Sequence, residues 1–245
     1  MISRLKTIVD LKKYPINDLN SPIMKKIIST CRNDLKKFSC STIPNFILPN
    51  SIKLMLNEVK NKLNEVYWSN KSINAYLNSK DNPSLPKEHP KNIFLNRNNG
   101  YLNSDLFEKD SEIKFLYKQQ ELLDFISACV EISPIYRWAD PLACHAYNMM
   151  KPDGILPWHF DSCEFTLSIL IQKPEKGGIF EYCPYIREPG NENFNEVKKV
   201  LRGDRTRVHQ LKLESGDLQI FKGRFTLHQV TKIEGKTPRY LVIPS

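Results

Sequence analysis

The stretch of sequence that decides the fold spans residues 156–183 and reads LPWHFDSCEFTLSILIQKPEKGGIFEYC. Runs of aliphatic, aromatic and β-branched residues alternate here with Pro and Gly, and Gly177-Gly178 marks a turn. Such short runs between turn residues are typical of strands, and they continue from about Pro141 to residue 245. The predicted strands are 142–149, 156–161, 164–172, 178–183, 206–213, 217–222, 226–233 and 238–243. Strands at this spacing predict a jelly roll, the double-stranded β-helix of cupin-like proteins.

The residues before this part have a helical pattern. Ser21-Pro22 is typical of a helix start, because a hydroxyl can cap the helix and Pro suits its first position. Further helices are predicted from Asn50 or Ser51, over Glu112–Glu131 and around Glu192–Leu201. The expected fold class is therefore mainly β with flanking helices.

The length of 245 residues suits one domain that spans residues 1–245. Within it we expect a helical N-terminal part over residues 1–68 and the jelly-roll core, with the functional site, over residues 141–245. Residues 69–104 are rich in Asn, Ser, Lys and Pro, which predicts a long loop and a candidate lid.

The composition excludes several classes of protein. Apolar residues make up 40% of the chain and charged residues 26%, which is enough to build a core and excludes disorder as the main state. Apolar runs such as Phe165–Ile171 fall far short of the roughly 20 residues of a membrane-spanning helix. The first residues lack the apolar region of a secretory signal. We therefore expect a cytoplasmic protein with no membrane partner and with its six cysteines reduced.

The charge is uneven along the chain. Residues 1–100 hold 17 Lys and Arg against 7 Asp and Glu, whereas the whole chain has a net charge of +9. A basic part can mark a nucleic-acid surface. These lysines instead interleave with Asn, Ser and Ile, without an Arg cluster or repeated aromatic residues. A solvated basic face is the favoured interpretation, and nucleic acid is not expected as a partner.

The residues that can carry chemistry begin with His159 and Asp161. Side chains alternate along a strand, so these two residues point to the same face. His228 lies in another predicted strand. Two histidines and one carboxylate on one face of a metal leave the other face open, which suits Fe(II) that activates dioxygen. Taken alone, an HxD pair usually lies on the surface or forms a hydrogen bond. A single His in a strand more often has a structural role than binds a metal.

Arg239 adds a further feature to this pattern. It follows His228 by 11 residues and lies on the last predicted strand, beyond a turn at Gly235. Its guanidinium could bind a carboxylate through two parallel hydrogen bonds at the bottom of the barrel. The alternative is an ordinary surface Arg, and the combined pattern favours the first interpretation.

Together these residues resemble those of the iron(II)/2-oxoglutarate-dependent dioxygenases. The likeness to one subgroup, which holds free-amino-acid hydroxylases and related amino-acid halogenases, covers roughly residues 85–245. The segments that carry it are PKEHP (86–90), ADPL (139–142), PWHFD (157–161), EFTLSILIQK (164–173), GGIFEYCPYIR (177–187) and DLQIFKGRFTLHQ (217–229).

The resemblance implies a role for each of the four residues. His159, Asp161 and His228 become the iron ligands, and Arg239 becomes the partner of the distal carboxylate of 2-oxoglutarate. The halogenases have a small residue in place of the carboxylate, so that chloride can bind the metal. This chain has Asp161 there and therefore resembles the hydroxylases.

Two candidate substrate residues lie on predicted strands. Trp158 precedes His159 and could form a wall of the iron pocket, although a buried core Trp is at least as plausible. Glu181 faces opposite to Phe180 and Tyr182. It could meet a cationic substrate or pair with Arg187.

Three more candidate substrate residues are charged or polar. Arg224 could share a face with His228 and bind a substrate carboxylate, or it could pair with Asp217. His89 and Arg97 belong to the long predicted loop, where a polar residue is usually solvated.

The expected activity is hydroxylation of a small polar molecule, a free amino acid or a derivative, with dioxygen as co-substrate and release of succinate and CO2. One alternative is an oxygenase that acts on a nucleic acid or on a protein side chain. The other is a jelly-roll binding protein without catalysis.

Overall fold

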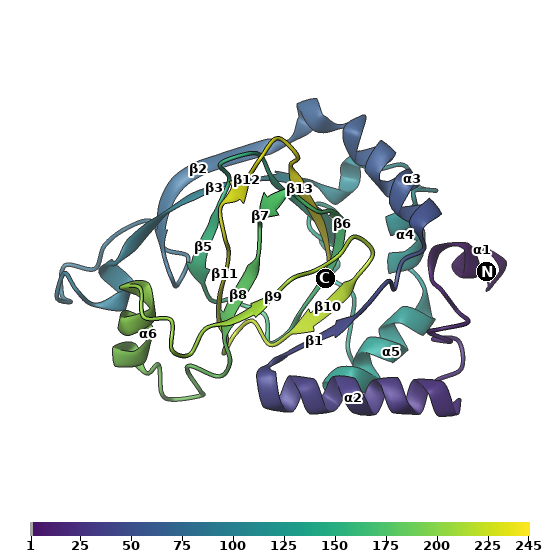
Figure 1. The fold of residues 1–245 in the computed structure, drawn as a ribbon, viewed down its shortest axis with the longest axis horizontal. Helices are drawn as coiled ribbons and strands as arrows, with labels where there is room; N and C mark the ends of the chain where they lie inside the picture. Colours follow the sequence, from purple (N-terminus) through teal and green to yellow (C-terminus); the bar gives the residue numbers. More distant parts are fainter. Residues whose placement is uncertain (1) are drawn as a thin grey trace.

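The computed structural model describes residues 2–245, whose strands form two facing sheets with helices packed outside the larger one (Figure 1). The helices are α1 (Ile2–Ile8), α2 (Pro22–Phe38), α3 (Pro49–Lys60), α4 (Glu112–Tyr117), α5 (Gln120–Val130) and α6 (Phe194–Leu201). Short 3-10 turns are η1 (Leu63–Glu65), η2 (Pro90–Asn92) and η3 (Ser104–Leu106).

The described strands bear out the prediction of a mainly β fold with a jelly-roll core. The larger sheet has the order β1-β10-β6-β13-β4-β3-β2, and the smaller sheet has the order β5-β11-β8-β9. The strands of the larger sheet are β1 (Cys40–Ile43), β2 (Tyr67–Asn74), β3 (Phe94–Leu102), β4 (His145–Met150), β6 (Thr166–Gln172), β10 (Leu218–Phe221) and β13 (Arg239–Pro244). The smaller sheet holds β5 (Leu156–His159), β8 (Phe180–Cys183), β9 (His209–Leu211) and β11 (Leu227–Val230). A separate pair is formed by β7 (Lys176–Gly177) and β12 (Ile233–Glu234).

The two faces of the larger sheet have different chemistry, because side chains alternate along each strand. In β4, Tyr147 and Met149 pack against the helices, whereas Asn148 between them points into the space between the sheets. The residues on the helix side of β6, β10 and β13 are Ile169, Ile171, Leu218, Ile220, Tyr240 and Val242. Those facing the smaller sheet include Ser168, Gln219, Arg239 and Leu241. The alternation thus separates an apolar core from a cavity that contains several buried polar side chains.

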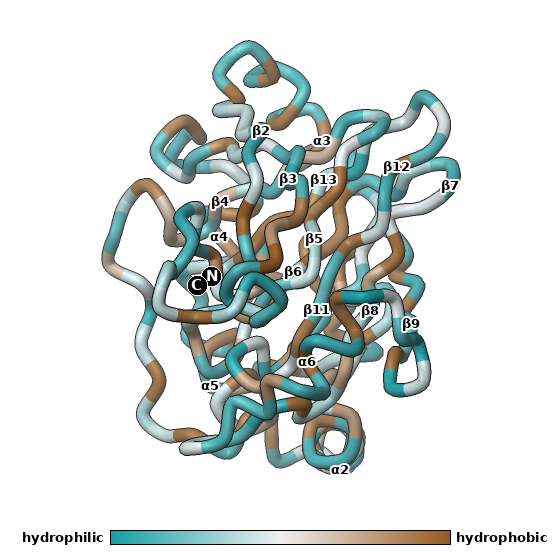
Figure 2. Tube along the Cα trace, turned by 90° about the vertical axis from the view of Figure 1, so that its left-hand side faces the viewer, coloured by the Kyte–Doolittle hydropathy of each residue, from teal (hydrophilic) through white to brown (hydrophobic). Residues whose placement is uncertain are grey.

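The helices complete the apolar side. Ser21 caps α2 by accepting a hydrogen bond from the Met24 N–H, and Pro22 occupies the first turn, as predicted. The buried face of α2 packs beside that of α5 in the main core. Figure 2 shows the hydrophobic residues concentrated along the central strands and many hydrophilic residues in the peripheral loops.

One predicted helix is divided in the structure. The helix expected over Glu112–Glu131 is split into α4 and α5 around Lys118-Gln119. Arg137 donates hydrogen bonds to the carbonyl oxygens of Tyr117 and Gln119, which stabilises this break.

The prediction of a long loop over residues 69–104 is wrong in part. β2 and β3 form a hairpin that occupies both ends of this range and extends the larger sheet. Only the connection between them, which includes η2, is irregular, so the lid remains a prediction for residues 75–93.

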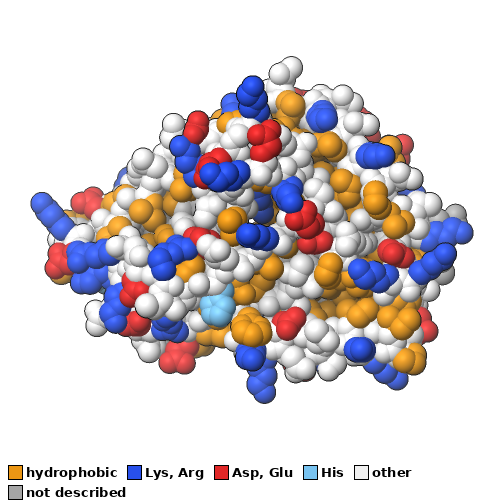
Figure 3. Space-filling view, in the orientation of Figure 1, with side chains coloured by type: hydrophobic (Ala, Val, Ile, Leu, Met, Phe, Trp, Pro, Cys, Tyr) orange, Lys and Arg blue, Asp and Glu red, His pale blue; other side chains and the backbone are white. Residues whose placement is uncertain are grey.

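The surface shows no single basic patch on the face drawn in Figure 3, where Lys and Arg are interspersed with acidic, apolar and uncharged side chains. This distribution gives no support to a nucleic-acid surface on that face. Among residues 2–245, no helix has both the length and the apolarity needed to cross a membrane. The cysteines in this range are free thiols.

Candidate metal centre

Strand pairing brings His159 and His228 together. β5 and β11 are antiparallel neighbours, and His159 lies directly opposite His228 in their register. The two imidazole centroids are 4.2 Å apart. Both rings are buried and point into the space between the two sheets.

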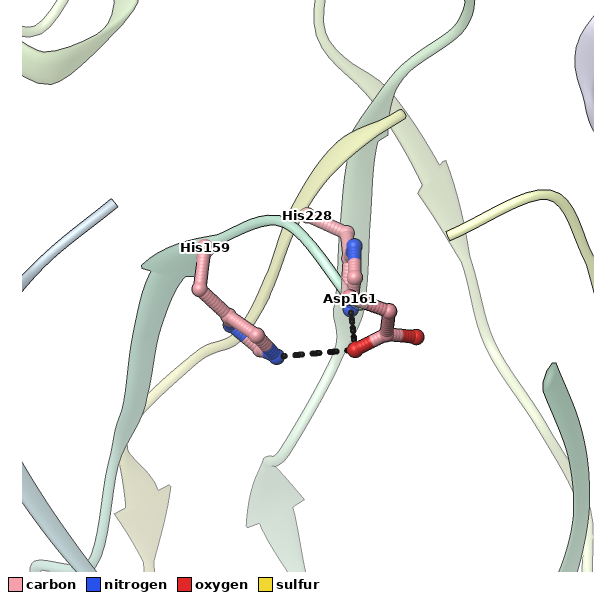
Figure 4. A group of neighbouring side chains, drawn as sticks. All are labelled: His159, Asp161 and His228. Atoms are coloured by element: carbon pink, nitrogen blue, oxygen red, sulfur yellow. Dashed lines mark ion pairs between the residues drawn. The ribbon is translucent and has the colours of Figure 1, made fainter. Parts of the chain in front are cut away.

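Asp161 completes the group from the segment that follows β5. Its Oδ1 lies 3.7 Å from Nε2 of His159 and 3.5 Å from Nε2 of His228 (Figure 4). One donor atom of each residue lies within 4.8 Å of the others. Two imidazole nitrogens and one carboxylate oxygen form the donor set that suits non-haem Fe(II). The three residues therefore fit such a metal.

Backbone carbonyl groups orient the two imidazoles. Nδ1 of His159 lies 2.7 Å from the Pro157 carbonyl oxygen, and Nδ1 of His228 lies 2.9 Å from that of Thr226. A proton on each Nδ1 satisfies these contacts and leaves the Nε2 lone pair free for a metal.

The protonation states also suit a cation. Burial lowers the pKa of His159 to about 3, and His228 acts in the same direction, so the imidazole is neutral. Burial alone would raise the pKa of Asp161. Its interactions with His228, followed by those with His159 and Thr166, outweigh this effect and hold the pKa below its usual range. The site thus presents the neutral imidazole of His159 and an ionised carboxylate.

Two neighbours hold the Asp161 carboxylate in place. The Thr166 hydroxyl donates to Oδ2 at 2.6 Å, and the Asp161 N–H donates to the Gly223 carbonyl oxygen at 3.1 Å. A Cβ at residue 223 would lie only 2.2 Å from Oδ2, so the carboxylate occupies space that only glycine leaves open.

Arg239 lies in the same cavity as the two histidines, at the start of β13. It is 3% exposed, and burial alone lowers its pKa to about 10, so it remains charged at neutral pH. No carboxylate among residues 2–245 forms an ion pair with it. Oδ1 of Asn148, in the same cavity, is buried without a hydrogen-bond partner among the described residues. The buried, unpaired cation of Arg239 fits the carboxylate of 2-oxoglutarate.

The comparisons with known proteins agree with this geometry. The family model described as Halogenase D matches residues 95–244, which include the three clustered residues and Arg239. The chain belongs to this family. No curated protein matches the sequence.

Solved structures of other proteins have a fold similar to that of this Halogenase D family member. A 2OG-Fe(II) oxygenase family protein from Burkholderia pseudomallei has a TM-score of 0.56 at 11% identity, with 88% of each chain covered. AviO1 from Streptomyces viridochromogenes Tue57 has a TM-score of 0.58 at 15% identity, covering 88% of this chain and 92% of that one. A prolyl hydroxylase from Trichoplax adhaerens, in complex with a peptide fragment, scores 0.55 at 13% identity, with 92% and 94% covered. The predicted resemblance to 2-oxoglutarate-dependent oxygenases is thus confirmed at the level of the fold.

Two of the predicted substrate residues in this family member point away from the cavity. Trp158 alternates with His159 on β5 and packs in a separate apolar cluster with Leu227 and Val197. Its position as a core Trp corrects the pocket-wall interpretation. Glu181 alternates with Phe180 on β8 and pairs with Arg205 at 2.5 Å, whereas Arg187 pairs with Glu192.

The remaining candidates also have other partners. Arg224 is exposed and donates two hydrogen bonds to the Ser162 carbonyl oxygen, and it does not form the alternative pair with Asp217, whose carboxylate accepts from backbone N–H groups. His89 caps η2 and packs against Phe194. Arg97 donates to Asn99 and Tyr101 and lines neither cavity described here, although its charge contributes to the lowered pKa of His159.

Sequence reasoning missed Thr166, Gly223 and Asn148 as neighbours of the site. Thr166 and Asn148 alternate with core residues on their strands, which is a signal that the sequence contains. The approach of Gly223 to Asp161 has no such signal, because the two lie on segments that are distant in the sequence.

Proposed function

We propose that this chain is an Fe(II)- and 2-oxoglutarate-dependent oxygenase that hydroxylates a small organic molecule. The observation that carries the proposal is a single cavity that holds both His159 and His228 beside Asp161 and the unpaired cation of Arg239. When bound, iron and 2-oxoglutarate would supply the oxidation: one dioxygen molecule is divided between succinate and the hydroxylated product, and CO2 leaves.

The residues of the chain position the reactants. His159, His228 and Asp161 would bind the metal through Nε2, Nε2 and Oδ1, the atoms that converge in the cavity. The Arg239 guanidinium would hold the distal carboxylate of 2-oxoglutarate. Apolar walls that include Phe180 and Leu241 would exclude water from the reaction.

Hydroxylation is favoured over halogenation, despite the name of the family. Asp161 supplies a carboxylate where the halogenases have a small residue, so chloride has no free position in the same donor set. The product formed in high chloride should therefore gain one oxygen atom. Mass spectrometry that finds chlorine in place of hydrogen would contradict this interpretation.

The type of substrate needs a separate argument. The sequence favours a small polar substrate, such as a free amino acid. The fold is compatible with both small and large substrates, because one similar structure is in complex with a peptide. The dispersed charges on the face drawn in Figure 3 favour a small molecule over a nucleic acid bound at that face.

The test is anaerobic binding of Fe(II) and 2-oxoglutarate, which gives a visible charge-transfer band when the keto acid chelates iron. We expect the band in the wild type and in the control His209→Ala, whose side chain is exposed, but not in His228→Ala. A full band in His228→Ala, or none in the wild type, would contradict the proposal.

Arg239→Lys tests the 2-oxoglutarate site. Lys keeps the charge but loses the planar fork, so the apparent KM for 2-oxoglutarate should rise roughly tenfold to hundredfold. Succinate formation measures this constant, and Arg207→Lys, at an exposed position, is the matched control. An unchanged KM in Arg239→Lys would remove this residue from the binding site.

A further inference from the structure

The turn between β10 and β11, residues 222–226, contacts two of the three candidate metal ligands. Its Gly223 carbonyl oxygen accepts from the Asp161 N–H at 3.1 Å, and a Cβ at residue 223 would lie 2.2 Å from Oδ2 of Asp161. At the other end of the turn, the Thr226 carbonyl oxygen lies 2.9 Å from Nδ1 of His228. A displacement of this turn would therefore move the atoms that orient both ligands.

Ser39, in the N-terminal part of the chain, binds both ends of this turn. Its carbonyl oxygen accepts from the Lys222 N–H at 2.8 Å, and its Oγ accepts from the Thr226 hydroxyl at 2.7 Å. Ser39 and Thr226 are both 0% exposed. Water cannot replace a contact at this depth, and a buried hydroxyl that loses its partner is unfavourable. The two contacts therefore hold the turn in place relative to the end of α2.

The backbone of Ser39 has a conformation that residues with a Cβ rarely adopt. Ser39 follows the last residue of α2 with φ 56° and ψ 6°, in the left-handed region, and its N–H donates to the Leu35 carbonyl oxygen. Helices commonly end with a left-handed residue, but Gly is the usual one because it has no Cβ. Disfavoured conformations persist where surrounding contacts determine them, and they are concentrated at functional sites. Ser at this position supplies the hydroxyl that Gly would lack.

Ser39 lies outside the segment that the family model matches, which begins at residue 95. β1, which directly follows Ser39, pairs with β10 in antiparallel register, with Cys40 opposite Phe221. This pairing brings the end of α2 to the start of the β10–β11 turn. The N-terminal part thus contacts the turn beside the metal centre, in addition to packing in the main apolar core.

We infer that Ser39 is a positioning residue of the metal centre and acts on Asp161 and His228 through the β10–β11 turn. Its two contacts hold the turn, before the metal binds, in the arrangement that the ligands need. Binding then does not have to order the turn, which favours a higher affinity for the metal. This inference rests on the proposed function, because it concerns the same metal centre.

Thr226→Val tests the contact at the turn, because it removes the hydroxyl that donates to Ser39 but keeps the backbone carbonyl. We expect Fe(II) to bind roughly threefold to tenfold more weakly, the factor that corresponds to one hydrogen bond between neutral groups. Titration of the charge-transfer band in excess 2-oxoglutarate without dioxygen measures this affinity. Thr226→Ser keeps the hydroxyl and should bind Fe(II) like the wild type. An unchanged affinity in Thr226→Val, or an equal loss in Thr226→Ser, overturns the inference.

Ser39→Gly removes the same contact from the other side, and Gly suits the left-handed backbone, so the variant should fold. If the two residues act through their hydrogen bond, Ser39→Gly/Thr226→Val should bind Fe(II) no more weakly than the weaker single variant. Fully additive losses overturn the inference.

Ser41→Ala is the matched control for stability. It removes another buried hydroxyl of the same region, which donates to Asp34 at 3.0 Å. Its free energy of unfolding should fall, whereas its affinity for Fe(II) should equal that of the wild type. A loss of affinity in Ser41→Ala as large as that in Thr226→Val would assign the effect to general stability and overturn the positioning role.

Hydrogen exchange tests the same role without metal. The Asp161 N–H is bound to the turn, so NMR of the metal-free protein should show it exchanging at least about threefold faster in Thr226→Val and Ser39→Gly than in the wild type or Ser41→Ala. If the wild type gives no charge-transfer band, the proposed function fails and exchange alone decides on the positioning role. If the band forms but exchange and affinity are unchanged in both variants, only the positioning role fails.

Discussion

The geometry of the proposed metal centre depends on residues other than the three candidate ligands. The Asp161 carboxylate lies against Gly223, at a distance where a Cβ cannot fit, and Thr166 donates a hydrogen bond to its outer oxygen. The carboxylate and the two imidazoles are thus positioned by contacts of the chain itself. Residues that orient metal ligands typically affect metal affinity by 10- to 100-fold when they are changed.

Gly223→Ala should therefore weaken Fe(II) binding by about 10- to 100-fold, because the new methyl group displaces Asp161. Anaerobic titration of the charge-transfer band in excess 2-oxoglutarate measures this affinity. Lys222→Ala, at the preceding residue, is the control and should bind Fe(II) like the wild type. An unchanged affinity in Gly223→Ala would show that Asp161 tolerates the displacement or does not bind the metal.

The sequence predicted the direction of individual side chains correctly where they alternate along a strand. It predicted that His159 and Asp161 face one way, and the structure brings both to His228. The same alternation argues against Trp158 as a pocket wall, since it points opposite to His159. The cavity that residues 135–138 form with the β5–β6 connection could not be predicted, because these segments meet only in the folded chain.

At the scale of elements, the β2–β3 hairpin is the largest departure from prediction. β2 reads YWSNKSIN, and its Asn, Ser and Lys residues have low strand propensity. It forms a strand because it pairs with β3 along its whole length at the edge of the larger sheet, where polar side chains can face water. Long-range pairing, which the sequence does not display, outweighs local propensity here.

The connection between β2 and β3 should respond to a substrate bound beside the metal centre. Leu77 lies in it and lines a cavity that also includes Asp161, while Lys80 and Lys87 are exposed. A compound that stimulates succinate formation, bound to the Fe(II)- and 2-oxoglutarate-loaded protein without dioxygen, should therefore slow tryptic cleavage at Lys80 and Lys87. Cleavage at the exposed Lys236, in the turn before β13, is the internal control. Equal cleavage rates at all three sites with and without the substrate would remove the lid interpretation.

At the scale of the whole molecule, the larger sheet separates two kinds of interior. One face packs against the helices in the main apolar core, and the other lines the cavity that holds the polar residues of the metal centre. This separation follows from alternation along β4, β6, β10 and β13, so one set of strands supplies both stability and the site. His145 is an exception, because it begins β4 and is buried against Phe107 and Tyr117 with Nδ1 lacking a partner among residues 2–245.

His145 should make the stability of the fold depend on pH. Burial lowers its pKa to about 4, and Lys114 and Lys118 add to this effect, whereas an unfolded His has a pKa near 6.5. Between these values the unfolded chain binds more protons than the folded one, so the free energy of unfolding falls as the pH decreases. A shift of this size corresponds to a loss of up to about 3 kcal/mol between pH 6.5 and pH 4.

His145→Leu removes this titration, so the variant should lose less stability than the wild type over the same pH range. Urea unfolding at several pH values measures the difference, with EDTA present so that metal binding does not contribute. His209→Leu, which changes an exposed His, should keep the pH dependence of the wild type. Parallel pH profiles for the wild type and His145→Leu would mean that His145 is protonated in the folded protein as readily as in the unfolded chain.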